Sequence, residues 1–189
     1  MEVRVIRGEK VLRAKSTGVP LPTGDRLMYV NARAIIERQT AEGVEILIQT
    51  RNKSYEKDQC LELPGGCVEE YESLIAAPRR EVWEETGLEL SEIEGVSTKI
   101  DIQAEETNVE CFQAFSVYQT TTGPVDSMGV CFRCKATGEL VDRGDGAEHP
   151  RWVSVRQLAQ WIIEDAGQFS WVDRAGMLFY LKHMGAVEG

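Results

Sequence analysis

The sequence has no long apolar run and few aromatic side chains. None of its 189 residues falls in a stretch of 18 or more consecutive apolar residues, and aromatic residues make up 7% of the chain. A membrane-spanning helix needs about 20 apolar residues in succession. The opening residues, MEVRVIR, also lack the apolar core of a signal peptide. These absences predict a cytoplasmic protein that does not associate with membranes.

Basic residues are scarce. The chain carries 21 Lys and Arg against 31 Asp and Glu, which gives a formal net charge of −10. Proteins that coat nucleic acids do so largely through Lys and Arg on a basic face. We therefore expect no nucleic acid polymer as a partner. A small phosphorylated ligand remains compatible, because a bound cation can reverse the sign of the local field.

The cysteines do not suggest a disulfide framework, because their number, five, is odd and cannot be divided into pairs. They are Cys60, Cys67, Cys111, Cys131 and Cys134. The last two form a C-x-x-C motif, but the segment 130–136 alternates like a strand. Side chains three residues apart on a strand point to opposite faces, so the two sulfurs should not converge. We expect buried free thiols rather than a zinc or redox site.

Against these absences stands a concentration of carboxylates in residues 66–88. If residues 73–86 form a helix, Glu81, Glu84 and Glu85 lie within an arc of about 100° on one face. Like charges so close repel each other unless something positive lies among them. Because the ligands are all oxygens, Mg²⁺ is favoured over zinc. The sequence thus predicts a site for a hard divalent cation.

A solvated acidic helix face is the usual meaning of clustered Glu residues, and it is the alternative here. The surroundings disfavour it. Pro64-Gly65-Gly66 precedes the cluster and Gly87-Leu88 follows it, which indicates a tight turn at one end and a helix C-cap at the other. A helix fixed at both ends directly behind a Gly-rich turn is better suited to a binding site.

The same segment resembles the signature of the Nudix hydrolases, G-x5-E-x7-R-E-U-x-E-E-x-G-U, where U is a bulky aliphatic residue. We call residues 66–88 the box. Its matching positions are Gly66, Glu72, Arg80, Glu81, Val82, Glu84, Glu85, Gly87 and Leu88. So many specified positions at fixed spacing make this motif far more specific than a lone Gly-rich pattern. The segments 61–66 and 148–154 also resemble the family, so that the likeness spans residues 28–161.

The resemblance implies an α/β fold, the Nudix-type α/β/α sandwich with a mixed β-sheet. Periodicity agrees with it. We expect strands at 29–37, 44–50, 98–103, 110–118 and 130–137. We also expect helices at Ser154–Glu164 and Asp173–Met184, capped by their first residues, the second with Met177, Leu178 and Leu181 on one stripe. Residues 28–189 would form the Nudix hydrolase domain. Residues 1–27 would be an N-terminal extension with a potential β-hairpin, which could extend the sheet or contact a second subunit in a homodimer; a simple surface hairpin is the alternative.

Pro78 departs from the usual pattern, because it falls inside the expected box helix. A proline in a helix interior costs up to ~3 kcal/mol. With Ser73 as a plausible N-cap, Pro78 lies only just beyond the first turn. We expect a kinked or late-starting helix that leaves the three glutamates unaffected.

The resemblance also implies an activity, the hydrolysis of a phosphoanhydride bond with Mg²⁺ as cofactor and Mn²⁺ as a potential substitute. Metal ligands would be Glu81, Glu84 and Glu85 with the carbonyl of Gly65, and Glu81 would help to orient or deprotonate the water. Arg80 and Glu72 would orient these carboxylates. Family members often recruit a further acid from a late loop. Glu148 is the first candidate and Asp145 the second, and a solvated loop acid is the alternative for each.

Contacts with the substrate are less well indicated. Arg51, at the end of a strand before the box, is a candidate phosphate ligand, and Lys53 and Lys57 are weaker ones; the alternative is an ordinary surface cation. Aromatic residues available for base stacking are more often core residues. They are Tyr55, Phe115, Phe132 and Trp171. The expected substrate is a nucleoside diphosphate linked to another moiety, or a modified nucleoside triphosphate.

Two classes of function remain open at this point. One is the Mg²⁺-dependent pyrophosphohydrolase acting on a small nucleotide-type molecule. The other is a sensing module in which a Nudix fold binds a nucleotide without turnover. Because every acidic position of the box is present, the sequence favours the enzyme.

Overall fold

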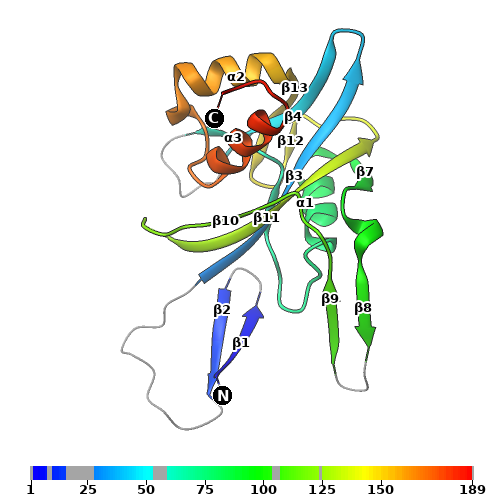
Figure 1. The fold of residues 1–189 in the computed structure, drawn as a ribbon, viewed down its shortest axis with the longest axis vertical. Helices are drawn as coiled ribbons and strands as arrows, with labels where there is room; N and C mark the ends of the chain where they lie inside the picture. Colours follow the sequence, from blue (N-terminus) through cyan, green and yellow to red (C-terminus); the bar gives the residue numbers. More distant parts are fainter. Residues whose placement is uncertain are drawn as a thin grey trace.

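The computed structural model describes residues 2–7, 10–15, 28–52, 59–103, 107–123 and 125–188, and for the first two ranges the backbone alone. It is an α/β/α sandwich with a mixed sheet between two layers of helices, as expected (Figure 1). One layer is α1 (Ala76–Thr86); the other contains α2 (Val155–Glu164) and α3 (Asp173–His183). Two short 3₁₀ helices, η1 (Val96–Thr98) and η2 (Ala166–Gln168), lie in the connections.

The central sheet has nine strands, with the order β10-β11-β3-β4-β13-β12, while β5 pairs with β4, β6 with β3 and β7 with β11. The strands β11 and β3 run parallel and the other described pairs are antiparallel. Their bounds are β3 (Met28–Thr40), β4 (Gly43–Arg51), β5 (Cys60–Glu62), β6 (Gly65–Cys67), β7 (Glu89–Ile93), β10 (Ser116–Gln119), β11 (Asp126–Thr137), β12 (Arg143–Gly144) and β13 (Ala147–Ser154).

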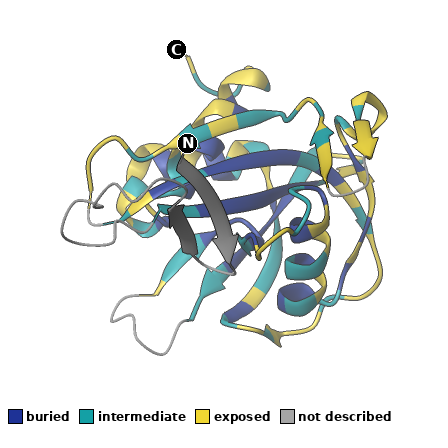
Figure 2. Ribbon diagram, turned by 90° about the horizontal axis from the view of Figure 1, so that it is seen from below, coloured by how far each residue is buried: buried dark blue, intermediate teal, exposed yellow. Residues whose placement is uncertain are grey.

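Alternating strand residues divide between two cores, because successive side chains of a strand point to opposite faces. Ala34 and Ile36 of β3 belong to the core beneath α1, with Val82 of that helix. Ile35, which lies between them, belongs to the core beneath α2 and α3. Buried residues run along the central strands in Figure 2. Since both faces of the sheet are covered, its central strands are apolar on both sides.

The strands β3 and β4 pair with each other only near the turn that joins them, at Glu37–Thr40 of β3. Beyond that region the two strands take other partners. The strand β6 pairs with residues 31–33 of β3, and β5 pairs with residues 49–51 of β4. The divergence of β3 and β4 thus places the entry to the box, residues 60–67, between two long strands.

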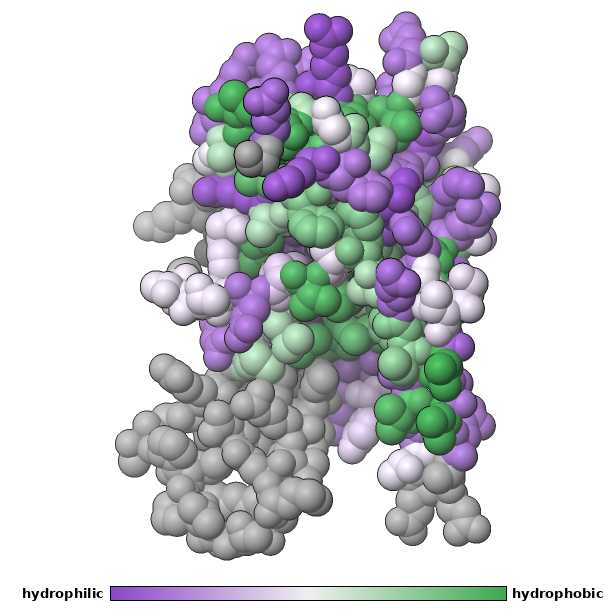
Figure 3. Space-filling view, viewed as in Figure 1, coloured by the Kyte–Doolittle hydropathy of each residue, from purple (hydrophilic) through white to green (hydrophobic). Residues whose placement is uncertain are grey.

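A separate two-stranded hairpin projects from the domain, formed by β8 (Ile100–Gln103) and β9 (Asn108–Cys111). Ile100, Ile102 and Val109 are all exposed, and hydrophobic atoms gather over the hairpin in Figure 3. In the N-terminal region, β1 (Glu2–Arg7) pairs antiparallel with β2 (Lys10–Lys15). The division of the chain at residue 27 and the homodimer stay predictions. No helix among the described residues is long and apolar enough to cross a membrane.

Three expectations about secondary structure outside the box were wrong. The strand predicted at 110–118 is divided between β9 and β10, because the chain leaves the β8–β9 hairpin before it joins the sheet. Asp173 does not cap α3; it is the first helical residue, and its buried carboxylate pairs with Arg33 instead. Leu178 is exposed, so the buried stripe of α3 contains Met177 and Leu181 without it. Met177 and Leu181 are four residues apart and share one helix face, whereas Leu178 is turned away from it by about 100°.

The prediction that the two sulfurs of the C-x-x-C motif do not converge is confirmed. Cys131 and Cys134 are both buried free thiols in β11. Cys131 belongs to the core beneath α2 and α3, and Cys134 to the core beneath α1. Burial raises the pKa of the Cys131 thiol to about 11. The two sulfurs thus lie on opposite faces of the sheet, as the strand periodicity requires.

Candidate active site

The box helix starts late, as predicted from Pro78, but its N-cap is Ile75 and not Ser73, whose hydroxyl accepts from the amide of Ile75 before the helix begins. The carbonyl of Ser73 accepts hydrogen bonds from the amides of Ala76 and Ala77, at 2.9 and 3.0 Å, and α1 begins at Ala76. Pro78 is therefore in the first turn, where a helix leaves its amides without intrahelical acceptors. Gly87 ends the helix in the left-handed conformation (φ 74°). The two ends fix which face of α1 meets the Gly-rich turn.

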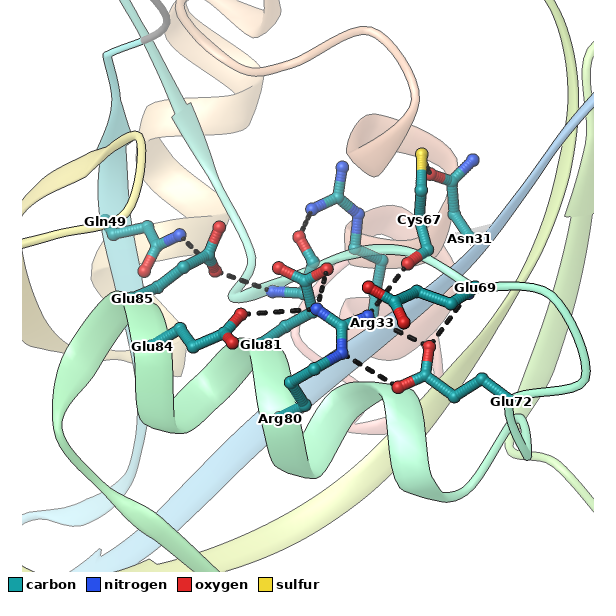
Figure 4. Close-up of polar contacts among 11 residues, drawn as sticks. Asn31, Arg33, Gln49, Cys67, Glu69, Glu72, Arg80, Glu81, Glu84 and Glu85 are labelled. Atoms are coloured by element: carbon teal, nitrogen blue, oxygen red, sulfur yellow. Dashed lines mark hydrogen bonds and ion pairs between the residues drawn. The ribbon is translucent and has the colours of Figure 1, made fainter. Parts of the chain in front are cut away.

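The three box glutamates project from the same side of α1, and Arg80 lies among them (Figure 4). Its Nη1 donates to Glu81 Oε1 at 2.8 Å and to Glu84 Oε2 at 3.2 Å. Its other nitrogens donate to the two carboxylate oxygens of Glu72, at 2.8 and 2.9 Å, and to the carbonyl of Cys67. One guanidinium thus contacts three carboxylates, those of Glu72, Glu81 and Glu84, and the orienting role of Arg80 and Glu72 stays a prediction.

These ion pairs and burial shift the ionisation of the cluster. Burial acts to raise the pKa of Glu72, but the hydrogen bonds from Arg80 and from the amide of Glu69 outweigh it and hold that pKa below its ordinary value. The hydrogen bond to Glu72 raises the pKa of Arg80. Burial raises the pKa of Glu81, against the opposing effect of Arg80. Glu81 is therefore more basic than an ordinary carboxylate.

Gly66 is needed because the carboxylate of Glu81 lies directly against it. A Cβ atom built on Gly66 would meet Glu81 Oε1 at 2.5 Å and its Cδ at 2.6 Å. Gly65, with φ 133°, is equally confined, since a Cβ there would meet the carbonyl oxygen of Ala32 at 2.3 Å. The two glycines let the turn approach both strand β3 and helix α1.

Glu85 lies deeper than the other two glutamates, with 2% of its surface exposed. Its Oε2 accepts hydrogen bonds from the amide of Gly65 at 2.9 Å and from Gln49 Nε2 at 2.8 Å. Burial, followed by the charge of Glu62, raises the pKa of Glu85 to about 8. The surroundings of this carboxyl thus favour a bound proton or a cation over an unpaired negative charge.

Behind Glu85 is a buried polar cluster that the sequence analysis missed. Glu62 is fully buried and pairs with Arg51 at 3.1 Å, while Gln49 bridges Glu62 and Glu85. Arg33 lies beside them and contacts the carbonyl of Gly65. A charged residue inside an otherwise apolar strand was the available signal, because such residues are rarely buried without a partner. The sequence alone does not show which residues pair with these buried charges.

The remaining candidates from the sequence are Arg51, Lys53, Lys57 and Asp145. Arg51 is the last residue of β4, as predicted, and its guanidinium contacts Glu62. Lys53 and Lys57 lie outside the described residues. Asp145 is exposed, and its amide donates to the carbonyl of Glu84 at 3.1 Å. Of the candidates that the structure describes, Arg51 thus lies in the buried cluster next to Glu85, and Asp145 lies beside the end of α1.

Glu148 does not lie in a loop, contrary to expectation. It is the second residue of β13, opposite Thr50 of β4, and its carboxylate is buried and paired with Arg143. The short β12–β13 pairing accounts for this, since it converts most of the predicted Gly-rich loop into a hairpin. None of the contacts described above joins Glu148 to the three box glutamates. Its role stays a prediction.

The residues at the site fit a hard divalent cation. Among the described residues, no three Asp, Glu, His or Cys side chains are gathered closely enough, as they stand, to hold a metal ion. The donors on the box face are nevertheless all oxygens, and the Gly65–Gly66 turn leaves Glu81 room beside it. Mg²⁺ rarely relies on an all-protein cage, because it keeps waters and shares substrate phosphates. An incomplete, oxygen-only set suits that ion.

Comparison with known proteins places the chain in a family. A family model described as the NUDIX domain matches residues 28–172. No curated protein matches the sequence. Three solved structures illustrate the shared fold. A MutT protein studied from Aliivibrio salmonicida and Vibrio cholerae has 20% identity and a TM-score of 0.56, covering 82% of this chain and 98% of its own.

The other two structures are similarly distant in sequence. A MutT protein from Methanosarcina mazei Go1 has 18% identity and a TM-score of 0.54, covering 87% of this chain and 100% of its own. The E. coli ORF135 protein has 19% identity and a TM-score of 0.55, covering 87% of this chain and 96% of its own. At such identities these likenesses concern the fold. Because the family model matches most of the chain, including the whole box, the chain belongs to the NUDIX family and is a Nudix pyrophosphohydrolase.

Proposed function

We propose that this enzyme uses Mg²⁺ to hydrolyse a phosphoanhydride bond in a nucleoside diphosphate linked to another moiety, or in a modified nucleoside triphosphate. One observation carries the proposal: Glu81, Glu84 and Glu85 project from one side of α1 against the Gly65–Gly66 turn. Negatively charged phosphate oxygens repel an attacking water, so the reaction requires neutralised charge, a held phosphate and an oriented water.

Glu81, Glu84 and Glu85, with the carbonyl of Gly65, would hold the cation, for which Mn²⁺ could substitute. When bound, Mg²⁺ neutralises phosphate charge and makes a coordinated water more acidic. The glutamates would differ in character. Glu85 is buried and fixed by two hydrogen bonds, whereas Glu84 is only half-buried. We assign Glu85 to the inner side of the cation site and Glu84 to the side that faces the substrate.

Glu81 is the preferred general base. Its carboxylate is held by Arg80 through Oε1, and burial raises its pKa toward the range useful at neutral pH. It would accept a proton from the attacking water or orient that water. Arg80 and Glu72 would act indirectly, by orienting the other carboxylates. Arg80 donates hydrogen bonds to Glu72 and Glu84, and the Glu72 carboxylate accepts from Arg80.

Two further residues are proposed for the substrate side. Arg51 ends strand β4 close to the buried cluster, where Glu62 fixes its guanidinium, and a fixed guanidinium suits a phosphate oxygen. Lys53 follows two residues later in the sequence and is proposed for the same task. Glu148 would serve as the additional acid. To reach the site it would have to leave Arg143.

The test is an assay in which nucleotide sugars, dinucleotides and modified nucleoside triphosphates are incubated with the enzyme and Mg²⁺. The measured quantity is hydrolysis of their phosphoanhydride bonds. We expect turnover of at least one class, dependence on the cation, and loss of turnover in Glu84→Gln. A nucleotide that binds tightly while no compound in the panel is cleaved would support a sensing module instead. Cleavage that persists in excess chelator would contradict the role of the cation.

A further inference from the structure

Arg33 is a charged residue in the middle of the central strand β3, and only 3% of its surface is exposed. It lies directly opposite Gly65 in the pairing of β3 with β6. Its Nη1 donates to the carbonyl oxygen of Gly65, and more weakly, at 3.4 Å, to that of Leu63. The side chain thus ends on the backbone turn that enters the box.

Two buried carboxylates surround this guanidinium. Nε of Arg33 lies 3.1 Å from Oδ1 of Asp173, at ion-pair distance though without hydrogen-bond alignment, and Nη1 lies 4.0 Å from Glu62 Oε2. Only 1% of Asp173 is exposed. A buried charge is costly unless it is paired, so each of these groups depends on the others for its place.

Asp173 connects this cluster to an element beyond the family match. The match ends at residue 172, and Asp173 is the first residue of α3. The start of α3 is anchored to the strand before the box by a hydrogen bond from the amide of Ser170 to the carbonyl of Leu61, at 2.7 Å. Buried Met177 and Leu181 hold the rest of the helix on the sheet. The position of α3 is therefore coupled to that of Arg33 through the ion pair of Asp173.

We propose that Arg33 is a positioning residue for the carbonyl of Gly65, and that Asp173 holds Arg33 in place. Through Asp173, α3 then helps to position a ligand of the cation. The proposal rests on the function proposed above, because it takes the Gly65 carbonyl as a cation ligand. A carbonyl oxygen has two lone pairs. Arg33 occupies one and fixes the orientation of the peptide group, and the other remains for the cation.

The backbone of Gly65 is then held from two sides. Its carbonyl oxygen accepts from Arg33, and its amide donates to Glu85, which is itself a proposed ligand. Loss of Arg33 or of its partner Asp173 should leave the turn less well ordered. Groups that orient metal ligands typically contribute about 10- to 100-fold to metal affinity. A purely structural ion pair would instead affect stability alone.

The experiment measures Mn²⁺ affinity by electron paramagnetic resonance, without substrate, in the full-length chain. The variants are Asp173→Asn, Arg33→Met and their combination. Tyr180→Phe is the matched control, because Tyr180 on the same helix donates to Glu37 at 2.7 Å and so makes a separate polar link from α3 to the sheet. We expect about 10-fold weaker Mn²⁺ binding in the first two. The control should lower the melting temperature without changing the affinity.

The combined variant should bind no more weakly than Arg33→Met alone, because Asp173 acts through Arg33. Should Arg33→Met fail to fold, Arg33→Lys takes its place; it keeps the charge and should weaken binding less than loss of the side chain would. Unchanged Mn²⁺ affinity in folded Asp173→Asn overturns the proposal. Tighter binding in either Arg33 variant also overturns it, by showing that the guanidinium competes with the cation. If the unmodified protein itself binds no Mn²⁺, the proposed function fails first.

Discussion

Arg80 and Glu72 form a two-point ion pair, in which Nε and Nη2 of the guanidinium donate to the two carboxylate oxygens at 2.8 and 2.9 Å. Such bidentate pairs fix the plane of the guanidinium as well as its position. The remaining nitrogen, Nη1, is thereby aimed at Glu81 and Glu84. Glu72 thus controls two proposed cation ligands without touching either.

Arg80→Ala should reduce activity less than loss of Glu84 and should raise the Mg²⁺ concentration required for half-maximal rate. The reason is that the carboxylates remain but lose the group that orients them. Initial rates across a Mg²⁺ titration measure both quantities. A lower Mg²⁺ requirement would mean that Arg80 mainly opposes the cation by its charge, and direct contact of Arg80 with a substrate phosphate in a complex would also contradict the orienting role.

Glu84→Gln and Glu85→Gln should each lower the catalytic rate by on the order of 100-fold or more, because each removes a charged cation ligand. The fold should survive, since glutamine retains the size and one acceptor oxygen. The control is Glu89→Gln, an exposed acid at the start of β7 near the helix end, which should leave the rate unchanged. Near-normal turnover in either box variant removes that residue from the site.

Gly66→Ala should give a folded protein with little activity. The added methyl group would clash with the carboxylate of Glu81. Because that carboxylate is the end of a flexible side chain, it can move aside without disturbing the backbone. Moving it removes a ligand and the proposed base from their place. Circular dichroism would report the fold and a kinetic assay the loss. Wild-type activity in this variant would show that Glu81 works from another position.

The cation-free protein should lose stability as the pH rises from about 4 to about 8. The folded state raises the pKa of Glu85 from 4.5 to about 8, and that of Asp173 from 3.8 to about 6. The folded state thus binds these protons more tightly than the unfolded state does, and the resulting stability is lost as the pH passes through the folded values. Thermal melts in a chelator measure the trend. Glu85→Gln should flatten it above pH 6, and an unchanged slope in that variant would assign the effect elsewhere.

Glu148→Gln should lower the catalytic rate constant with little change in the Michaelis constant, as expected of an interaction made mainly in the transition state. Arg143→Ala offers a comparison, because it frees the Glu148 carboxylate from its ion pair and should not reduce the rate. Unchanged kinetics in Glu148→Gln, together with a strong loss in Asp145→Asn, would transfer the role to Asp145.

The sequence alone determined the elements whose residues are close along the chain. Helical spacing placed Glu81, Glu84 and Glu85 on one face, and Pro78 indicated that the helix starts late, although Ile75 rather than Ser73 stands at its N-cap. Two-residue alternation separated Cys131 from Cys134. In each case the backbone geometry of one element fixes the answer, so no distant residue is needed to obtain it.

Only the tertiary structure decided which distant residues meet. Arg33, Glu62 and Asp173 come from three separate elements, and no local pattern shows that they share one buried cluster. The same limit explains two wrong predictions. Asp173 was expected to cap α3 but pairs with Arg33, and Glu148 was expected in a loop but belongs to strand β13, which pairs with β4. A buried charge takes whichever opposite charge the fold brings near, because leaving it unpaired costs far more than a local preference provides.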